Sequence, residues 1–397
     1  MRGPSRRLLL APVTITATKP LLPTHVKGFL WVDTLYRSTR LVRDLEYYWN
    51  PRAANLTGQT IQFWDHLDRR HPGLDHDTLS VEDLGHLYVR FHASGDARPM
   101  DRLRHYTERV EREGWVHPST RAATRGWQRQ LGLLGVHDPG LTADRPAAAS
   151  IDETVELLVR RHLCVDHRGH GGPAYLDGTR WGMPLRPVIG ADAHANYLLI
   201  ILRDLLPRLA EGDEVLLVHD DDLAHDYALL ARVLGELGAR PSRLPLGRVP
   251  IGGAARSSRY GGWDGHSLGR LAELCLREFD PAVYRLGMRL YFIAMLKRTA
   301  SEPFRLDLLR RAMTRAGRML DEAGVPNETV KAAGDGGAGG TGRAGETDVT
   351  GGADDGDDLP AYLGGFAAPA GWIDPYRLTD GLFARRPSPA LLKQVYL

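Results

Sequence analysis

The segment Thr16–Gly28 is the first in the chain whose residue types could do chemistry. It runs from a predicted strand, through a loop punctuated by prolines, to His25, Lys27 and Gly28 at a predicted helix start. Free peptide N–H groups and the helix dipole favour an anion at such a place. An imidazole and an ammonium beside them could stabilise charge that develops on a phosphate. The segment predicts a phosphate site, and a capping loop with a surface histidine is the alternative.

Three consecutive carboxylates form the second candidate group. Asp220, Asp221 and Asp222 follow the apolar run Glu214–Val218, and His225 comes shortly after them. Carboxylates at the end of a buried strand repel each other unless a ligand, a cation or a basic group compensates them. The cluster therefore indicates ribose hydroxyls, Mg²⁺ or a cationic substrate group, and an acidic helix N-cap is the alternative.

The third candidate is the loop Arg248–Trp263, in which glycines flank two arginines and two hydroxyls. Backbone N–H groups, hydroxyls and guanidinium groups are the donors that a mobile phosphate clamp requires. The members that could form it are Arg256, Ser257, Ser258, Arg259 and Gly261. A surface loop without chemistry is the alternative.

Other common chemistries lack their signatures in this sequence. The chain has 16 histidines but no HExxH, and it has neither a Walker loop nor a Gly-x-Ser-x-Gly motif. Its 2 cysteines, Cys164 and Cys275, lie far apart, which gives no zinc-site spacing. With 51 basic and 49 acidic side chains, no global field would draw the protein to nucleic acid.

The elements that must position these groups alternate between strands and helices. Strand-like runs cover 8–15, 45–49 and 214–218, and helix-like patterns cover 29–43, 103–115, 120–134, 155–163 and 227–237. This order predicts an α/β fold with a doubly wound parallel sheet, whose ligands bind beyond the carboxyl ends of the strands. From 268 to about 323 the pattern is almost entirely helical.

The composition divides the chain further. Many of its 44 glycines lie in 332–358, which has almost no side chain large enough to bury, so we expect a flexible linker there. The tail 359–397 is apolar enough to pack back on the body or to meet a partner. No apolar run reaches the ~20 residues that span a bilayer. No export signal is recognised, so the expected location is the cytoplasm.

In their order and spacing, these segments resemble signatures of the class I aminoacyl-tRNA synthetases, most closely arginyl-tRNA synthetase. Pro20–Gly28 resembles PTGPLHVGH, with His25 at its first histidine, and Arg256–Gly261 resembles KMSTRKG. Val218–Asp222 resembles VVGADQ. Further similar segments are Glu46–Asn50 (REYYVND), Gln128–Asp138 (DLxxLGIxFD), Asp177–Thr179 (SDGTPTY), Leu234–Gly238 (ALRALG) and Leu268–Glu273 (LDDLLDE).

The resemblance implies a Rossmann-like nucleotide-binding core of the HUP type that uses ATP and Mg²⁺ to adenylate an amino acid. The acceptor would be tRNA or another group, and a cationic amino acid is expected. The implied catalytic residues are His25, Lys27, Arg256, Ser257, Ser258 and Arg259. ATP would contact Thr24, Gly28, Asp221, Asp222, His225 and Gly261, and the amino acid would contact Asn50 and Asp192, with no protein-built metal site.

The resemblance also sets an expected domain organisation. Residues 8–310 would form the catalytic core with a helical insertion at about 65–150, followed by a helical extension at 311–331, the linker and the tail. No anticodon-binding domain is recognised. The signature's second histidine is absent and its loop lysine falls on Ala255. A catalytically degenerate binding or regulatory module is therefore the second hypothesis.

Overall fold

The computed structural model describes most of the chain. The described residues are 7–12, 15–49, 56–143, 145–253, 258–326 and 359–397. The predicted linker at 332–358 lies outside them and stays a prediction.

A parallel sheet of four strands forms the centre of the molecule, in the order β2-β1-β6-β7. The two middle strands are apolar along their length because both of their faces are covered, which is usual for parallel sheets. The strands are β1 (Leu8–Pro12), β2 (Leu45–Tyr47), β6 (Glu214–Asp220) and β7 (Arg240–Leu246). The predicted doubly wound α/β fold is confirmed.

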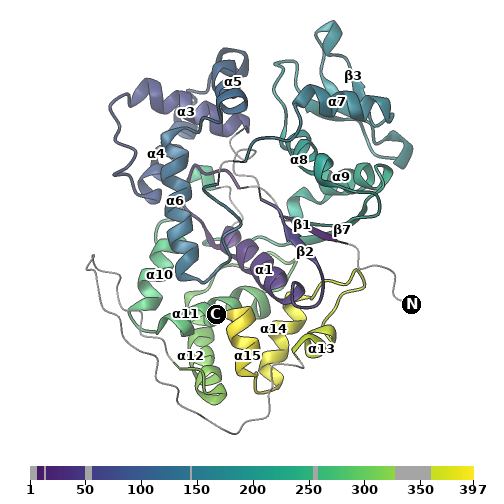
Figure 1. Cartoon of the computed structure of the whole chain (residues 1–397). Coiled ribbons are helices and arrows are strands. Elements are labelled where there is room, and N and C mark those ends of the chain that lie inside the picture. The colour runs from purple at the N-terminus through teal and green to yellow at the C-terminus, as the bar shows by residue number, and fades with distance from the viewer. Residues whose placement is uncertain (1–6, 13–14, 50–55, 144, 254–257, 327–358) are drawn as a thin grey trace, which may run out of the picture.

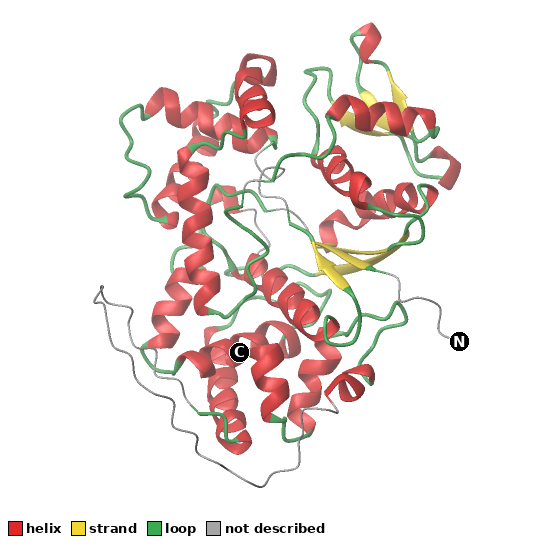
Figure 2. Cartoon of the chain, in the orientation of Figure 1, coloured by secondary structure: helices red, strands yellow, loops and turns green. Residues whose placement is uncertain are grey.

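Helices cover both faces of this sheet (Figure 2). Since successive side chains of a strand point to opposite faces, β1 places Leu8 and Leu10 in one core cluster and Leu9 in the other. The first cluster includes the buried face of α1 (Pro23–Thr39), and the second includes those of α8 (Tyr197–Leu205) and α9 (Ala224–Glu236). The two core clusters therefore pack on opposite faces of the same strands, and these strands end at the candidate site.

A helical insertion follows β2 and stands at the upper left of Figure 1. It packs through a small aromatic core of its own that includes Trp64 and Tyr106, and it contacts the body through Ile200 of α8. Its helices are α3 (Gly58–Arg70), α4 (Val81–Ser94), the 3₁₀ turn η1 (Met100–Leu103), α5 (Arg104–Glu113) and α6 (Pro118–Leu133).

A second insertion, which the sequence patterns did not predict, carries a small antiparallel sheet in the order β3-β4-β5. Its strands are three or four residues long, too short for a periodic pattern to show. The elements are α7 (Ile151–Arg160), β3 (Cys164–Asp166), β4 (Ala174–Leu176) and β5 (Arg186–Ile189).

The C-terminal half of the chain is helical, and the tail packs against it (Figure 1). The Ile373 N–H donates to Thr39 Oγ1 of α1 at 3.0 Å, and Tyr396 is fully buried in the same core as α1. The elements are α10 (Leu268–Leu276), α11 (Pro281–Arg289), the π-helix η7 (Leu290–Met295), α12 (Leu306–Ala323), α13 (Leu359–Gly364), α14 (Pro375–Ala384), α15 (Pro389–Leu391) and the π-helix η8 (Leu392–Tyr396).

Short 3₁₀ turns complete the chain: η2 (Arg168–His170), η3 (Thr179–Trp181), η4 (Leu206–Arg208), η5 (Asp221–Leu223) and η6 (Ser258–Tyr260). Within the described residues, no helix combines the length and the apolar character needed to cross a membrane.

Candidate functional site

His25 lies in the first turn of α1, which begins at Pro23 rather than at the expected Phe29. Proline suits the first helical position because its missing N–H would have no partner there. His25 Nδ1 accepts the Leu22 N–H at 3.0 Å, so a neutral ring carries its proton on Nε2. Burial, and then the charges of Lys19 and Arg248, lower the pKa of His25 to about 3. His25 is therefore a neutral donor at a helix N-terminus.

Lys19 is a candidate that the sequence patterns missed. Its Nζ lies 3.4 Å from Thr16 Oγ1 and 5.4 Å from the centroid of the Tyr88 ring. Burial lowers the pKa of Lys19 to about 8, and the same charge contributes to the lowered pKa of His25. Its sequence signal is weak because only the folded chain brings Lys19 beside His25 and α4.

Lys27 does not occupy the catalytic position that was predicted for it. Its side chain is 1% exposed, and Nζ donates to three backbone carbonyls, those of Gly247, Lys297 and Arg298, at 2.8 to 3.0 Å. An ammonium has three protons to donate, so these carbonyls use its full donor capacity. Lys27 therefore ties α1 to the segments after β7 and η7, and it has no proton left for a ligand.

Thr24 holds a structural position, whereas Gly28 lines a recess. Thr24 Oγ1 accepts the Val249 N–H at 3.0 Å and donates to the Val249 carbonyl at 3.3 Å, which fastens α1 to the start of the glycine loop. Gly28 lines a small apolar recess, together with Ile15, Trp49 and Asp220. Gly28 thus stays on the cleft side of the helix, whereas the hydroxyl of Thr24 is already used.

The acidic cluster is compensated by Arg248. The Arg248 Nε lies 3.0 Å from Asp222 Oδ2 and 3.8 Å from Asp220 Oδ2. Burial raises the pKa of Asp220, whose side chain at the strand end is partly buried. Asp221 and His225 are exposed at the start of α9 and could reach a ligand.

His219, which stands where the synthetase signature has glycine, has a packing role. Its ring stacks on the buried Tyr227 of α9 with centroids 4.5 Å apart, and its Nδ1 donates to the Asp220 carbonyl at 2.9 Å. The histidine side chain therefore packs between the end of β6 and α9, where the signature's glycine would have no side chain.

Four glycines flank the predicted phosphate loop and adopt the left-handed backbone conformation. Gly252, Gly253, Gly261 and Gly262 all have φ between 65° and 86°, where glycine is favoured. Arg256 and Ser257 lie outside the described residues, and so does the side chain of Ser258. The Arg259 guanidinium lies 5.0 Å from the centroid of the Tyr260 ring. Arg259 Nε is buried without a hydrogen-bond partner among the described residues.

Charge interactions show that the three predicted segments converge. Lys19 and Arg248 both lower the pKa of His25, and Arg248 holds the acidic turn. Burial first, and then the charges of Arg259 and Lys19, lower the pKa of His92 on α4. Arg248, at the start of the third segment, therefore lies near both His25 of the first segment and Asp222 of the second, and charges from the first and third segments also reach His92.

Two residues, Asp192 and Asn50, were predicted to contact the amino acid. Asp192 is exposed in the turn after β5, where its Oδ1 accepts the His194 N–H at 3.2 Å, and Asn50 lies outside the described residues. A neighbouring group that the sequence reading missed is built around Asp226 of α9. Arg186 Nη2 donates to Asp226 Oδ2 at 2.9 Å, and Arg186 Nε lies 2.9 Å from Oδ1 as an ion pair. The Tyr197 hydroxyl also donates to Oδ2.

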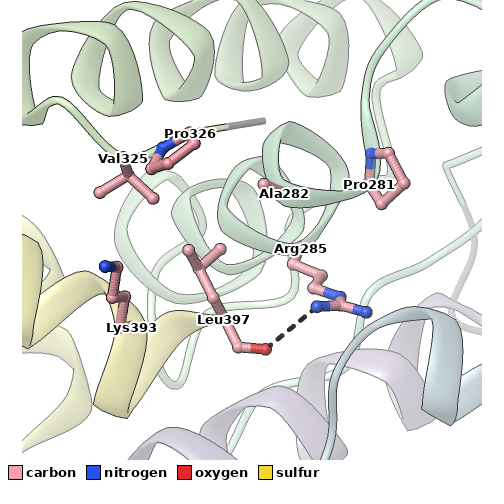
Figure 3. Close-up of a pocket in the computed structure, with 7 residues that line it drawn as sticks. All are labelled: Pro281, Ala282, Arg285, Val325, Pro326, Lys393 and Leu397. Carbon is pink, nitrogen blue, oxygen red and sulfur yellow. Dashed lines mark hydrogen bonds between the residues drawn. The ribbon is translucent and has the colours of Figure 1, made fainter. Parts of the chain in front are cut away.

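A separate cavity of about 440 Å³ lies between α11, the end of α12 and η8 (Figure 3). Arg285 lines it and donates to the Leu397 carbonyl at 3.5 Å, and Lys393 supplies a second cation. None of the predicted site residues lines this cavity. For metals, the described residues hold no group of three or more histidines, cysteines or carboxylates that could bind an ion.

The four-stranded parallel sheet, with helices on both of its faces, defines an α/β fold. Arginyl-tRNA synthetase from Thermus thermophilus matches with a TM-score of 0.57 and 14% identity, over 85% of this chain and 66% of that chain. The Plasmodium falciparum arginyl-tRNA synthetase matches with a TM-score of 0.56 and 10% identity, over 81% of this chain and 58% of that chain.

A putative arginyl-tRNA synthetase from Campylobacter jejuni has a TM-score of 0.50 and 14% identity, over 81% of this chain and 70% of that chain. The predicted resemblance is confirmed at the level of the fold. The chain spans about two thirds of the length of the Thermus protein. It matches no protein-family model and no curated protein sequence.

Proposed function

We propose that this protein uses ATP to activate the carboxyl group of an amino acid or a related acid as an adenylate. The observation that carries the proposal is the cluster at the start of α1. The Thr24 hydroxyl holds Val249 beside His25, Arg248 Nε lies 3.0 Å from Asp222 Oδ2, and the charges of Lys19 and Arg248 lower the pKa of His25. The charges of Arg259 and Lys19 act in the same way on His92. The set holds three cations and one neutral imidazole donor, and such groups bind the oxygens of a polyphosphate. The likeness of fold to arginyl-tRNA synthetases supports the same reaction class.

In this reaction a carboxylate oxygen of the acid attacks the α-phosphorus of ATP. The bond from that phosphorus to the bridging oxygen breaks, and its electron pair leaves with pyrophosphate. Catalysis of such a displacement depends on positioning and on stabilising charge. His25 Nε2–H would donate to an α-phosphate oxygen, while Lys19 and Arg259 would face the leaving pyrophosphate.

The residues fit ATP better than they fit a protein-built metal site. Arg259 Nε and His92 Nε2 are buried and have no hydrogen-bond partner among the described residues, and phosphate oxygens would supply acceptors for them. Mg²⁺ is commonly bound through substrate phosphates with only one or two carboxylates. It would arrive with ATP and neutralise phosphate charge, and the exposed Asp221 is the carboxylate best placed to approach it.

The acceptor of the activated group stays open within the proposal. Transfer to tRNA would follow the named activity of the similar proteins, and transfer to another amine or hydroxyl is the alternative. A cationic substrate is less favoured than the sequence indicated. Asp220, Asp222 and Asp226 already face Arg248 or Arg186, and Asp192 caps its own turn.

A degenerate binding module is the second candidate function. It is favoured by Lys27, whose ammonium is fully used inside the fold, and by Ala255 in place of the signature's lysine. Such a module would bind a nucleotide or an acid without turnover.

ATP–pyrophosphate exchange across the amino acids separates the two functions. We expect exchange with at least one acid, and we expect His25→Ala to lower its rate about 100-fold or more, as loss of one transition-state donor does. The exposed His105→Ala serves as the matched control and should leave the rate unchanged. Absence of exchange with every acid tested would leave the binding module. Charging of total tRNA then tests the acceptor.

A further inference from the structure

Helix α4 of the insertion is the surface on which two candidate phosphate segments rest (Figure 1). Trp263, at the end of the glycine loop, stacks on His86 with ring centroids 4.8 Å apart. His86 Nε2 also lies 3.4 Å from Asp264 Oδ1. An ideal Cβ on Gly261 would lie 3.5 Å from Val89 Cγ1, so the loop backbone runs directly along the helix.

The first segment meets the same helix one turn away. A Cβ on Gly85 would lie 2.5 Å from the Pro20 ring and 2.9 Å from Trp263, so Gly85 is where both segments touch α4. Trp127 of α6 donates its indole N–H to the Lys19 carbonyl at 3.0 Å, which fixes the backbone beside it. The spacing between Lys19 and the loop is therefore set by the insertion.

His92 is near the cations that these two segments supply, because the charges of Arg259 and Lys19 add to burial in lowering its pKa. Its ring packs edge-on against Tyr88 with centroids 4.5 Å apart, and Lys19 Nζ lies 5.4 Å from the centroid of the same Tyr88 ring. His92 Nε2 is buried and has no hydrogen-bond partner among the described residues. Neither Lys19 nor Arg259 forms an ion pair within the described part of the chain.

Two cations that converge without a counter-charge repel each other, and they do so more strongly where water is excluded. A buried donor without an acceptor adds a cost of its own. One anion between Lys19, Arg259 and His92 would remove both costs. Of the anions in the proposed reaction, the pyrophosphate part of ATP has the charge and the number of oxygens to satisfy all three groups.

We propose that α4 forms one wall of a pyrophosphate subsite and that His92 Nε2 donates to a phosphate oxygen there. The proposal rests on the proposed function for the source of the anion and adds a residue from outside the two signature segments. Tyr88 supports the His92 ring, and Trp263 holds the loop that brings Arg259 to the same anion.

Equilibrium titration of the full chain with inorganic pyrophosphate, ATP and AMP tests the proposal. Replacing His92 by alanine should weaken pyrophosphate and ATP binding by about tenfold or more, which is the usual effect of losing a hydrogen bond to a charged group. AMP binding should not change. His92→Gln keeps an N–H donor near the position of Nε2 and should recover part of the affinity. His105→Ala, on an exposed position of the same insertion, is the control.

Three results would overturn the proposal: no pyrophosphate binding by the wild-type chain, binding within twofold of wild type after His92→Ala, or equal weakening of AMP. The exchange assay separates this failure from failure of the proposed function. If the chain binds pyrophosphate through His92 but catalyses no exchange with any acid, the pyrophosphate subsite is supported and the proposed enzymatic function is contradicted. If the exchange rate is normal after His92→Ala, the enzymatic function is supported and the role of His92 is contradicted.

Discussion

At the residue scale, Lys27 and Lys19 show that the same side chain has opposite uses on the two sides of one loop. The ammonium of Lys27 donates all three of its protons to backbone carbonyls inside the fold. The ammonium of Lys19 makes one long hydrogen bond, to Thr16, within the described residues. The sequence shows two lysines near a histidine. It does not show which ammonium is enclosed, because lysines are seldom buried and the enclosing carbonyls come from residues 247 to 298.

Lys27→Met is expected to destabilise the fold without a selective effect on a ligand. The change leaves three carbonyls without their donor, and unsatisfied buried groups cost about 1–3 kcal/mol each before relaxation. The free energy of unfolding in urea should fall by at least about 2 kcal/mol. Lys297→Met, whose side chain is 77% exposed, is the control and should stay within about 0.5 kcal/mol. A stable Lys27→Met protein that has lost only nucleotide binding would restore the catalytic interpretation.

His25 predicts a pH dependence of stability. Its pKa is lowered to about 3 in the folded chain and is ordinary, near 6.5, in the unfolded chain. Between these values the unfolded chain binds the extra proton, so stability rises with pH and is lost as the pH falls below about 6.5. The charges that face His25 are those of Lys19 and Arg248. Lys19, with a pKa of about 8, remains protonated across this window.

His25→Gln removes this titration. Urea unfolding from pH 4.5 to 6 should show a shallower rise in the free energy of unfolding for the variant, by up to about 1.4 kcal/mol per pH unit. Curves that run parallel for the two proteins would show that His25 is protonated alike in both states.

At the element scale, strands with a continuous apolar or aromatic run could be predicted from the sequence, whereas β7, in which polar residues and prolines interrupt the apolar ones, could not. β1 and β6 carry continuous apolar runs because both of their faces are buried, and such runs are visible in one dimension. β3, β4 and β5 hold three or four residues each, so tertiary pairing alone defines them. The glycines that flank the loop were visible in the sequence, whereas the contact of the loop with α4 depends on a pair such as Trp263 and His86, far apart in the chain.

Gly85→Ala should disturb the spacing that α4 imposes. The added methyl group would overlap both Pro20 and Trp263, and overpacking of this kind typically costs about 1–3 kcal/mol. We expect a lower melting temperature and a larger loss of pyrophosphate affinity than of AMP affinity. Gly132→Ala is the matched control, because it is an exposed helical position with no atom within 4 Å of its Cβ. That change should raise stability by up to about 1 kcal/mol. Equal melting temperatures for Gly85→Ala and the wild type would contradict the close contact.

At the scale of the whole molecule, the tail and the sheet belong to one hydrophobic core. The first core cluster joins Leu10 of β1, Trp31 of α1, Phe292 of η7 and Tyr396 of η8. A buried ion pair between Asp33 of α1 and Arg289 of α11 crosses the same region. Stability of the candidate site is therefore coupled to the packing of a segment that lies more than 300 residues away along the chain.

Tyr396→Ala is the change that tests this coupling. The Tyr396 ring is fully buried, and its hydroxyl lies 3.2 Å from Thr379 Oγ1, so truncation removes both packing and a hydrogen bond. Loss of a buried aromatic side chain typically costs about 3–5 kcal/mol. Tyr376, 38% exposed in the same tail, is the matched control, and Tyr376→Ala should cost about 0.5 kcal/mol or less. Urea unfolding followed by circular dichroism measures both. If the tail were an independent appendage, neither change would move the transition of the sheet and helices. A transition of the whole chain that shifts only for Tyr396→Ala is the expected result, because the tail belongs to the same hydrophobic core as α1 and β1.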